Sequence, residues 1–67
     1  MRNGDIESAI VATVRQTLTE ITRASEAELN ERLAAAGILL QPFDLDFVLS
    51  RHPALFRINY KGEWALA

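Results

Sequence analysis

The closing stretch HPALFRINYKGEWALA, residues 52–67, decides the fold because its apolar residues follow a different period from those before it. In the preceding chain, apolar residues recur three and four positions apart, which is typical of helices. In the closing stretch they occupy alternate positions, first Phe56 and Ile58, then Trp64 and Leu66. Alternation is typical of strands. The sequence therefore predicts a helical body that ends in a β-hairpin.

The length of the hairpin loop follows from the face on which Trp64 must lie. With a two-residue loop at Lys61-Gly62, Trp64 would lie on one face of the hairpin and the apolar residues of the first strand on the other face. A three-residue loop instead pairs Ile58 with Trp64 and brings all four large apolar side chains to one face. It also places Gly62 at the third loop position, where such hairpins favour a left-handed residue. We expect this face to cover the helices, and the outer face and tip of the hairpin to carry Arg57, Asn59, Tyr60 and Lys61.

A stripe of apolar and threonine residues from Ile6 to Ile21 predicts an amphipathic first helix, with Asn3 or Asp5 as its N-cap. Its threonines weaken the helical pattern near residues 21–23. We expect a short strand or a linker there.

Two further helices are bounded by capping signals. Ser25 and Glu28 form an S-x-x-E capping box, and Gly37 stands where a left-handed C-terminal residue ends a helix. These signals predict a second helix over about 26–36. Pro42 fits the first turn of a third helix, and the residue before Pro53 is disfavoured in helical geometry, so PFDLDFVLSR, residues 42–51, is expected to be helical.

Composition limits the possible classes of function. The 67 residues allow one domain, residues 1–67, and the absence of cysteine excludes a disulfide or a thiolate metal site. A net charge of −2 argues against general affinity for nucleic acid or anionic membranes. No apolar run approaches the ~20 residues of a membrane helix, and no signal-peptide pattern begins the chain. We expect a soluble, cytoplasmic protein, either complete or one module of a longer chain.

The residues also give no pattern for catalysis. Asp44 and Asp46 lie about 200° apart on a helix and cannot act as a pair. The serines lack a GxSxG context, and His52 is the only histidine. The sequence therefore predicts no enzyme, no metal or cofactor site and no small-molecule substrate.

The third helix carries one aromatic pair too many for a single buried face. Leu45 and Leu49 share one face with Val48, whereas Phe43 and Phe47 lie nearly opposite. In one interpretation, Phe43 belongs to the incoming loop and Phe47 is half covered. In the other, an aromatic patch is exposed for a partner.

The order helix, short extended segment, helix, helix, hairpin is that of a winged helix-turn-helix, an α+β fold. The chain resembles small winged-helix modules of the HARE-HTH and LOTUS (OST-HTH) kind, in which the third helix ends in "vL..hP.lF" and the second wing strand carries G-x-W-x-L. The resemblance rests on Val48, Leu49, His52, Pro53, Leu55, Phe56, Gly62, Trp64 and Leu66. It implies a non-catalytic module, commonly part of a larger protein that handles DNA or RNA, with the third helix and the wing as usual contact surfaces.

Two functional hypotheses remain. In the first, which composition favours, the domain docks a protein or a second copy of itself through Phe43, Phe47, Ser50 and Arg51. In the second, it binds nucleic acid directly, and weakly, through Arg51, Arg57, Asn59, Tyr60 and Lys61. The two carboxylates of the third helix would be repelled by phosphates, so the wing is the better nucleic-acid surface.

Overall fold

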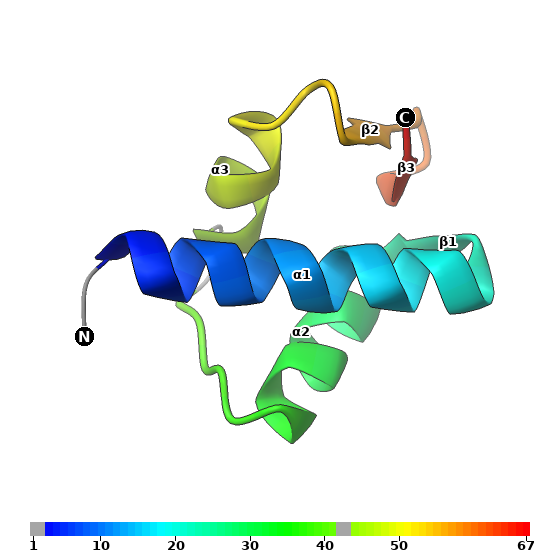
Figure 1. Ribbon diagram of the computed structural model, residues 1–67. Helices are drawn as coiled ribbons and strands as arrows, with labels where there is room; N and C mark the ends of the chain where they lie inside the picture. Colours follow the sequence, from blue (N-terminus) through cyan, green and yellow to red (C-terminus); the bar gives the residue numbers. More distant parts are fainter. Residues whose placement is uncertain (1–2, 42–43) are drawn as a thin grey trace.

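The computed structural model describes residues 3–41 and 44–67, which form an α+β unit (Figure 1). In chain order its elements are α1 (Asn3–Ile21), β1 (Arg23–Ser25), α2 (Glu26–Ala35), α3 (Asp44–Ser50), β2 (Phe56–Ile58) and β3 (Glu63–Leu66). Among the described residues these are three helices and one three-stranded antiparallel sheet of order β1-β3-β2. None of these helices is long and apolar enough to cross a membrane.

The hairpin has the predicted register. Phe56 pairs with Leu66 and Ile58 with Trp64, while the Asn59 amide donates to the Glu63 carbonyl oxygen over 3.0 Å. Gly62 has a φ of +81°, the left-handed conformation expected at the third loop position. The three-residue loop is thus confirmed.

One expectation about the hairpin face is wrong. Phe56 and Trp64 are buried and Leu66 packs against the core, but the Ile58 side chain is 50% exposed. Ile58 is the last residue of the edge strand before the loop, so it shares the inner face of the sheet without being covered by a helix.

The expected short strand exists, but it lies two residues later than 21–23. β1 pairs antiparallel with β3, so that Arg23 is opposite Ala65 and Ala24 is opposite Trp64. Helix α1 ends at Ile21, and Thr22, with a φ of 70°, turns the chain into the strand. The strand therefore begins only after this left-handed residue.

Both ends of α2 follow the predicted capping chemistry. The Ser25 hydroxyl accepts a hydrogen bond from the Glu28 amide over 3.3 Å. At the other end Gly37 has a φ of +84°, and the Ile38 amide donates to the Leu33 carbonyl oxygen over 2.8 Å. This is the bond pattern of a Schellman motif, and it ends α2 one residue earlier than predicted.

The third helix ends one residue earlier than predicted, since α3 ends at Ser50 and Arg51 follows it in a turn. The expectations for Pro42 and Phe43 lie outside the described residues.

The core lies where α1 crosses α2, α3 and the inner face of the sheet (Figure 1). Side chains of every described element contribute to it, and Trp64 at the centre of the sheet is only 3% exposed. The buried apolar residues are Ile10, Val14, Leu18, Ala24, Leu29, Leu33, Leu45, Leu49, Phe56 and Trp64. Helix α1 is thereby fixed against both the helical and the sheet half of the domain.

Candidate interaction surfaces

The outer face of α3 exposes an aromatic side chain. Leu45 and Leu49 are buried, whereas Phe47 on the opposite side is 65% exposed. The guanidinium carbon of Arg51 lies 5.7 Å from the centroid of the Phe47 ring, close enough for a cation–π interaction. Ser50 is exposed at the end of the same helix. Three of the residues predicted for partner binding are therefore together on one exposed face, and the fourth, Phe43, lies outside the described residues.

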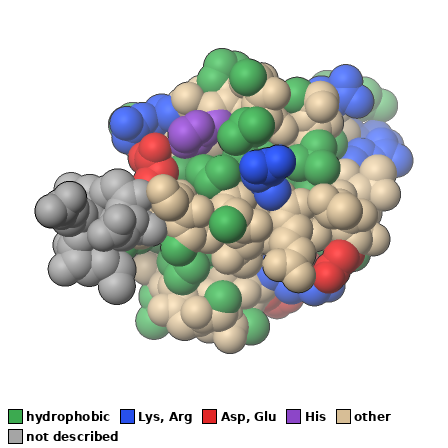
Figure 2. All heavy atoms as spheres, in the orientation of Figure 1, with side chains coloured by type: hydrophobic (Ala, Val, Ile, Leu, Met, Phe, Trp, Pro, Cys, Tyr) green, Lys and Arg blue, Asp and Glu red, His purple; other side chains and the backbone are tan. Residues whose placement is uncertain are grey.

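Arg51 is held in position by an acidic residue of α1. Its Nη1 atom lies 3.1 Å from Glu7 Oε1, and His52 Nε2 lies 3.1 Å from Glu7 Oε2. One carboxylate thus links α1 to two consecutive residues that follow α3. Figure 2 shows an acidic, a basic and the histidine side chain gathered on one face of the molecule. Sequence reasoning missed Glu7, because its two partners are more than forty positions away along the chain.

A shallow apolar hollow of about 210 Å³ adjoins the exposed aromatic ring. Its walls come from the first turns of α1, from the segment after α2 and from α3. The lining residues are Ile6, Glu7, Ile10, Leu40, Asp44, Phe47 and Val48. Ile6 is 37% exposed, so the apolar surface extends from Phe47 onto α1.

Two of the residues predicted for nucleic-acid binding already have partners within the chain. Arg51 is paired with Glu7, and the Asn59 side chain is bonded within its own hairpin. Asn59 Oδ1 accepts from the amides of Lys61 and Glu63, each over 2.9 Å, and Nδ2 donates to Glu63 Oε1 over 3.0 Å. Asn59 therefore shapes the loop rather than presenting its amide to a ligand.

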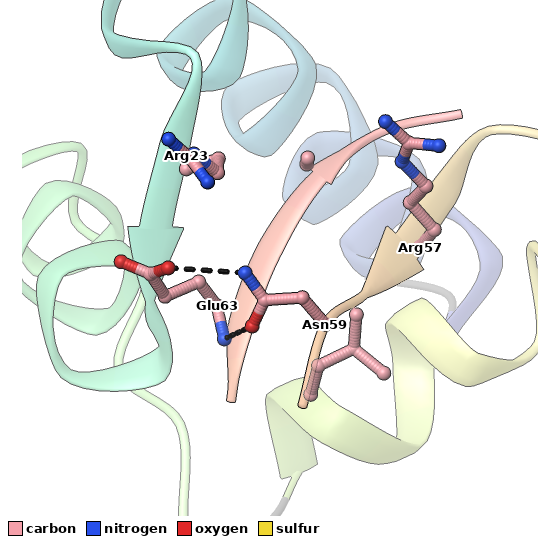
Figure 3. Close-up of a pocket in the computed structure, with 6 residues that line it drawn as sticks. Arg23, Arg57, Asn59 and Glu63 are labelled. Carbon is pink, nitrogen blue, oxygen red and sulfur yellow. Dashed lines mark hydrogen bonds between the residues drawn. The ribbon is translucent and has the colours of Figure 1, made fainter. Parts of the chain in front are cut away.

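At the hairpin tip, Tyr60 and Lys61 are exposed, and Lys61 Nζ lies 5.8 Å from the centroid of the Tyr60 ring. Arg57 instead lies on the outer face of the sheet, where the structure adds a second basic residue, Arg23 (Figure 3). Sequence reasoning missed Arg23 because β1 reaches this face only by pairing with β3.

Among the described residues no three histidine, cysteine, aspartate or glutamate side chains gather in a group that could hold a metal ion.

Comparisons with known proteins give no likeness: no family model, no curated protein and no solved structure matches this chain significantly.

Proposed function

We propose that the chain is a non-catalytic winged helix-turn-helix domain that associates with a second copy of itself through the outer face of α3. The order of the elements and the sheet order β1-β3-β2 support the fold. The exposed Phe47, flanked by Arg51, is the observation that carries the interface. Aromatic and arginine side chains are enriched among the residues that dominate binding energy at protein interfaces.

The distribution of charge on α3 favours a second copy as the partner. Asp44 and Phe47 are three residues apart on α3 and share one face of the helix, and Arg51, in the turn after α3, lies against the Phe47 ring. Phe47 lies near the midpoint between the acid and the base. In an antiparallel pair of α3 helices around a two-fold axis, the two Phe47 rings would meet near the axis. Asp44 of each copy would then face Arg51 of the other, which is the self-complementarity that a two-fold interface requires.

Arg51 can serve both its own chain and a partner. A guanidinium group has five N–H donors, and the contact with Glu7 involves only the Nη1 atom of Arg51. The Arg51 side chain is still 57% exposed, so its other donors can reach a partner. Its pairing with Glu7 and its position over Phe47 restrict its rotamers before association. Less side-chain entropy is then lost on binding.

Direct binding of nucleic acid through α3 and the wing has less support. Asp44 and Asp46 are exposed on α3 and would repel phosphates, while Arg51 and Asn59 already have partners within the chain. We expect any such binding to be no tighter than the ~10⁻⁴–10⁻⁶ M of non-specific contacts.

Sedimentation equilibrium over protein concentrations from about 10 μM to about 1 mM tests self-association, since weak dimers dissociate in this range. Phe47→Ala should weaken the dimer about 30-fold, the equivalent of ~2 kcal/mol. Because the ring is exposed, the same variant should keep its free energy of unfolding within about 1 kcal/mol of wild type. The buried Leu49, changed to alanine, should instead lose about 3–5 kcal/mol of stability. A large loss of stability in Phe47→Ala would remove the ring from the interface.

Neutralising one acid at a time tests the antiparallel pairing. Asp44→Asn keeps a side-chain oxygen that can accept from the Gln41 amide, now bonded to Asp44 Oδ2 over 3.0 Å, but removes the charge that faces Arg51 of the other copy. It should weaken the dimer about fivefold, since two symmetric surface pairs are lost. Asp46→Asn removes the same charge from another face of α3 and should leave the dimer unchanged. A wild-type chain that stays monomeric throughout the concentration range would overturn the proposal.

A further inference from the structure

The three strands place two arginines on either side of a small residue. Arg23 and Arg57 both pair with Ala65, so the three residues form one row across the sheet. Ala24 and Trp64, the neighbours of this row, are buried. Because successive side chains of a strand alternate between faces, the row points away from the core. Figure 3 shows the two guanidinium groups flanking β3 on this outer face.

The spacing of the strands lets both arginines reach one ligand. Neighbouring strands lie about 4.8 Å apart, so the Cα atoms of Arg23 and Arg57 are separated by roughly 10 Å. Because the side chain of Ala65 is only a methyl group, it does not fill the space between the two arginine side chains. Two adjoining hollows, of about 300 and 520 Å³, share these three residues as lining. The first hollow continues toward Asn59 and the second toward the end of α1.

The arginines of this row have no acidic partner among the described residues. The ion pairs within residues 3–41 and 44–67 involve Arg32, Arg51 and His52, and neither Arg23 nor Arg57 takes part in one. Glu63 is the acidic residue that lines the smaller hollow, and one of its carboxylate oxygens accepts from Asn59 Nδ2. Glu63 lies two residues before Ala65 on the same face of β3, so it is a diagonal neighbour of both arginines (Figure 3). Two positive charges thus face a shared hollow, and neither arginine forms an ion pair with the carboxylate of Glu63 that also lines it.

We infer that the outer face of the sheet binds a phosphate group between Arg23 and Arg57. A guanidinium fork donates two parallel hydrogen bonds to an oxyanion. One such fork engages both oxygens of a carboxylate from a single side, whereas the tetrahedral oxygens of a phosphate offer pairs of acceptors to two forks on opposite sides. Thr22 also lines the larger hollow, and its side chain carries a hydroxyl donor. The phosphate could belong to a small phosphomonoester or to a nucleic-acid strand, and this site does not depend on the proposed dimer.

Titration of the ¹⁵N-labelled chain with inorganic phosphate, against sodium chloride at equal ionic strength, tests the site. The Nε–Hε signals of Arg23 and Arg57 and the Ala65 amide should shift saturably with phosphate and not with chloride. Arg23→Gln and Arg57→Gln should each weaken phosphate binding about tenfold, because each removes charge-assisted hydrogen bonds. Arg15→Gln, an exposed arginine of α1 outside the hollows, is the matched control and should bind phosphate as wild type does.

Glu63→Gln supplies a test in the opposite direction. It retains a side-chain oxygen that can accept from Asn59 but removes the negative charge from this face. It should tighten phosphate binding two- to threefold, as roughly expected for one screened charge. Glycerol phosphate and an oligothymidylate, compared at equal phosphate concentration, distinguish the sources, since tighter binding of the oligonucleotide indicates a strand. Shifts that chloride reproduces, or phosphate binding that Arg23→Gln and Arg57→Gln leave unchanged, would overturn the inference.

Discussion

Thr22 is a residue whose backbone conformation conflicts with its side chain. Its φ of 70° lies in the left-handed region, which is a genuine outlier for a β-branched residue. The Thr22 amide donates to the Leu18 carbonyl oxygen over 3.0 Å, and the next residue begins β1. The reversal from helix to strand must therefore be made at this position. A left-handed L-residue costs roughly 1–2 kcal/mol, whereas glycine adopts the conformation without steric cost.

Thr22→Gly should therefore raise the free energy of unfolding by about 1 kcal/mol, the relief of strain exceeding the entropy that glycine adds to the unfolded chain. Thr19→Gly is the matched control, since Thr19 is exposed within α1 and its hydroxyl donates to the Arg15 carbonyl oxygen. This variant should lose a few tenths of a kcal/mol, up to about 0.5 kcal/mol, because threonine is itself a poor helix former. Urea denaturation of both beside wild type measures the two values. A Thr22→Gly variant less stable than wild type would contradict the argument.

At the scale of elements, the sequence was sufficient wherever the determinants were local. The hairpin register could be predicted because a period of two and one glycine, all within a short segment, determine it. The outward face of Phe47 could be predicted because Leu45 and Leu49 already satisfy the inner face of α3, but the pattern left open whether the ring is half covered or exposed. The alternation of apolar residues shows on which face of a strand a side chain lies but not whether a helix covers it. The prediction that Ile58 is covered was therefore wrong. The bounds of β1 and the role of Arg23 depend on pairing with β3, some forty residues later, which no local pattern shows.

The hairpin loop depends on the Asn59 side chain, which bonds the Lys61 and Glu63 amides and the Glu63 carboxylate. Asn59→Ala should lower the free energy of unfolding by about 1–2 kcal/mol, because loop amides lose their acceptor. Tyr60→Ala, one residue away and 94% exposed, should change stability by no more than about 0.5 kcal/mol. Thermal denaturation compares the two variants. Equal losses for both would show that the Asn59 bonds contribute nothing to the hairpin.

At the scale of the whole molecule, α1 separates the two candidate surfaces. The hollow beside Phe47 includes Glu7 near the start of α1, and the larger hollow of the sheet includes Thr22 just after its end. At 1.5 Å per helical residue, these positions are roughly 22 Å apart. Figure 1 shows α3 over the first half of α1 and the sheet beside its second half. A second copy on α3 and a phosphate on the sheet would therefore not compete for space.

The contact of Glu7 with Arg51 and His52 joins parts of the chain that are some forty-five residues apart. The His52 carbonyl oxygen in turn accepts from the amides of Leu55 and Phe56, so this contact also positions the start of β2 against α1. The Glu7 side chain is only 26% exposed and has two partners. It should therefore contribute near the upper end of the ~0–1 kcal/mol range for ion pairs at the surface.

Glu7→Gln keeps the size of the side chain but removes its charge, and it should lower the free energy of unfolding by about 1 kcal/mol at low salt. Glu20→Gln is the matched control, because it removes a longer and more exposed ion pair. Glu20 Oε2 lies 3.8 Å from Arg32 Nη1, and both side chains are about half exposed. It should lose less than about 0.5 kcal/mol. Urea denaturation at low salt and at about 1 M sodium chloride should show the loss in Glu7→Gln shrinking at high salt, where the screening length falls to ~3 Å. If Glu7→Gln loses no more stability than Glu20→Gln at low salt, the first helix is held against α3 and β2 by apolar packing alone.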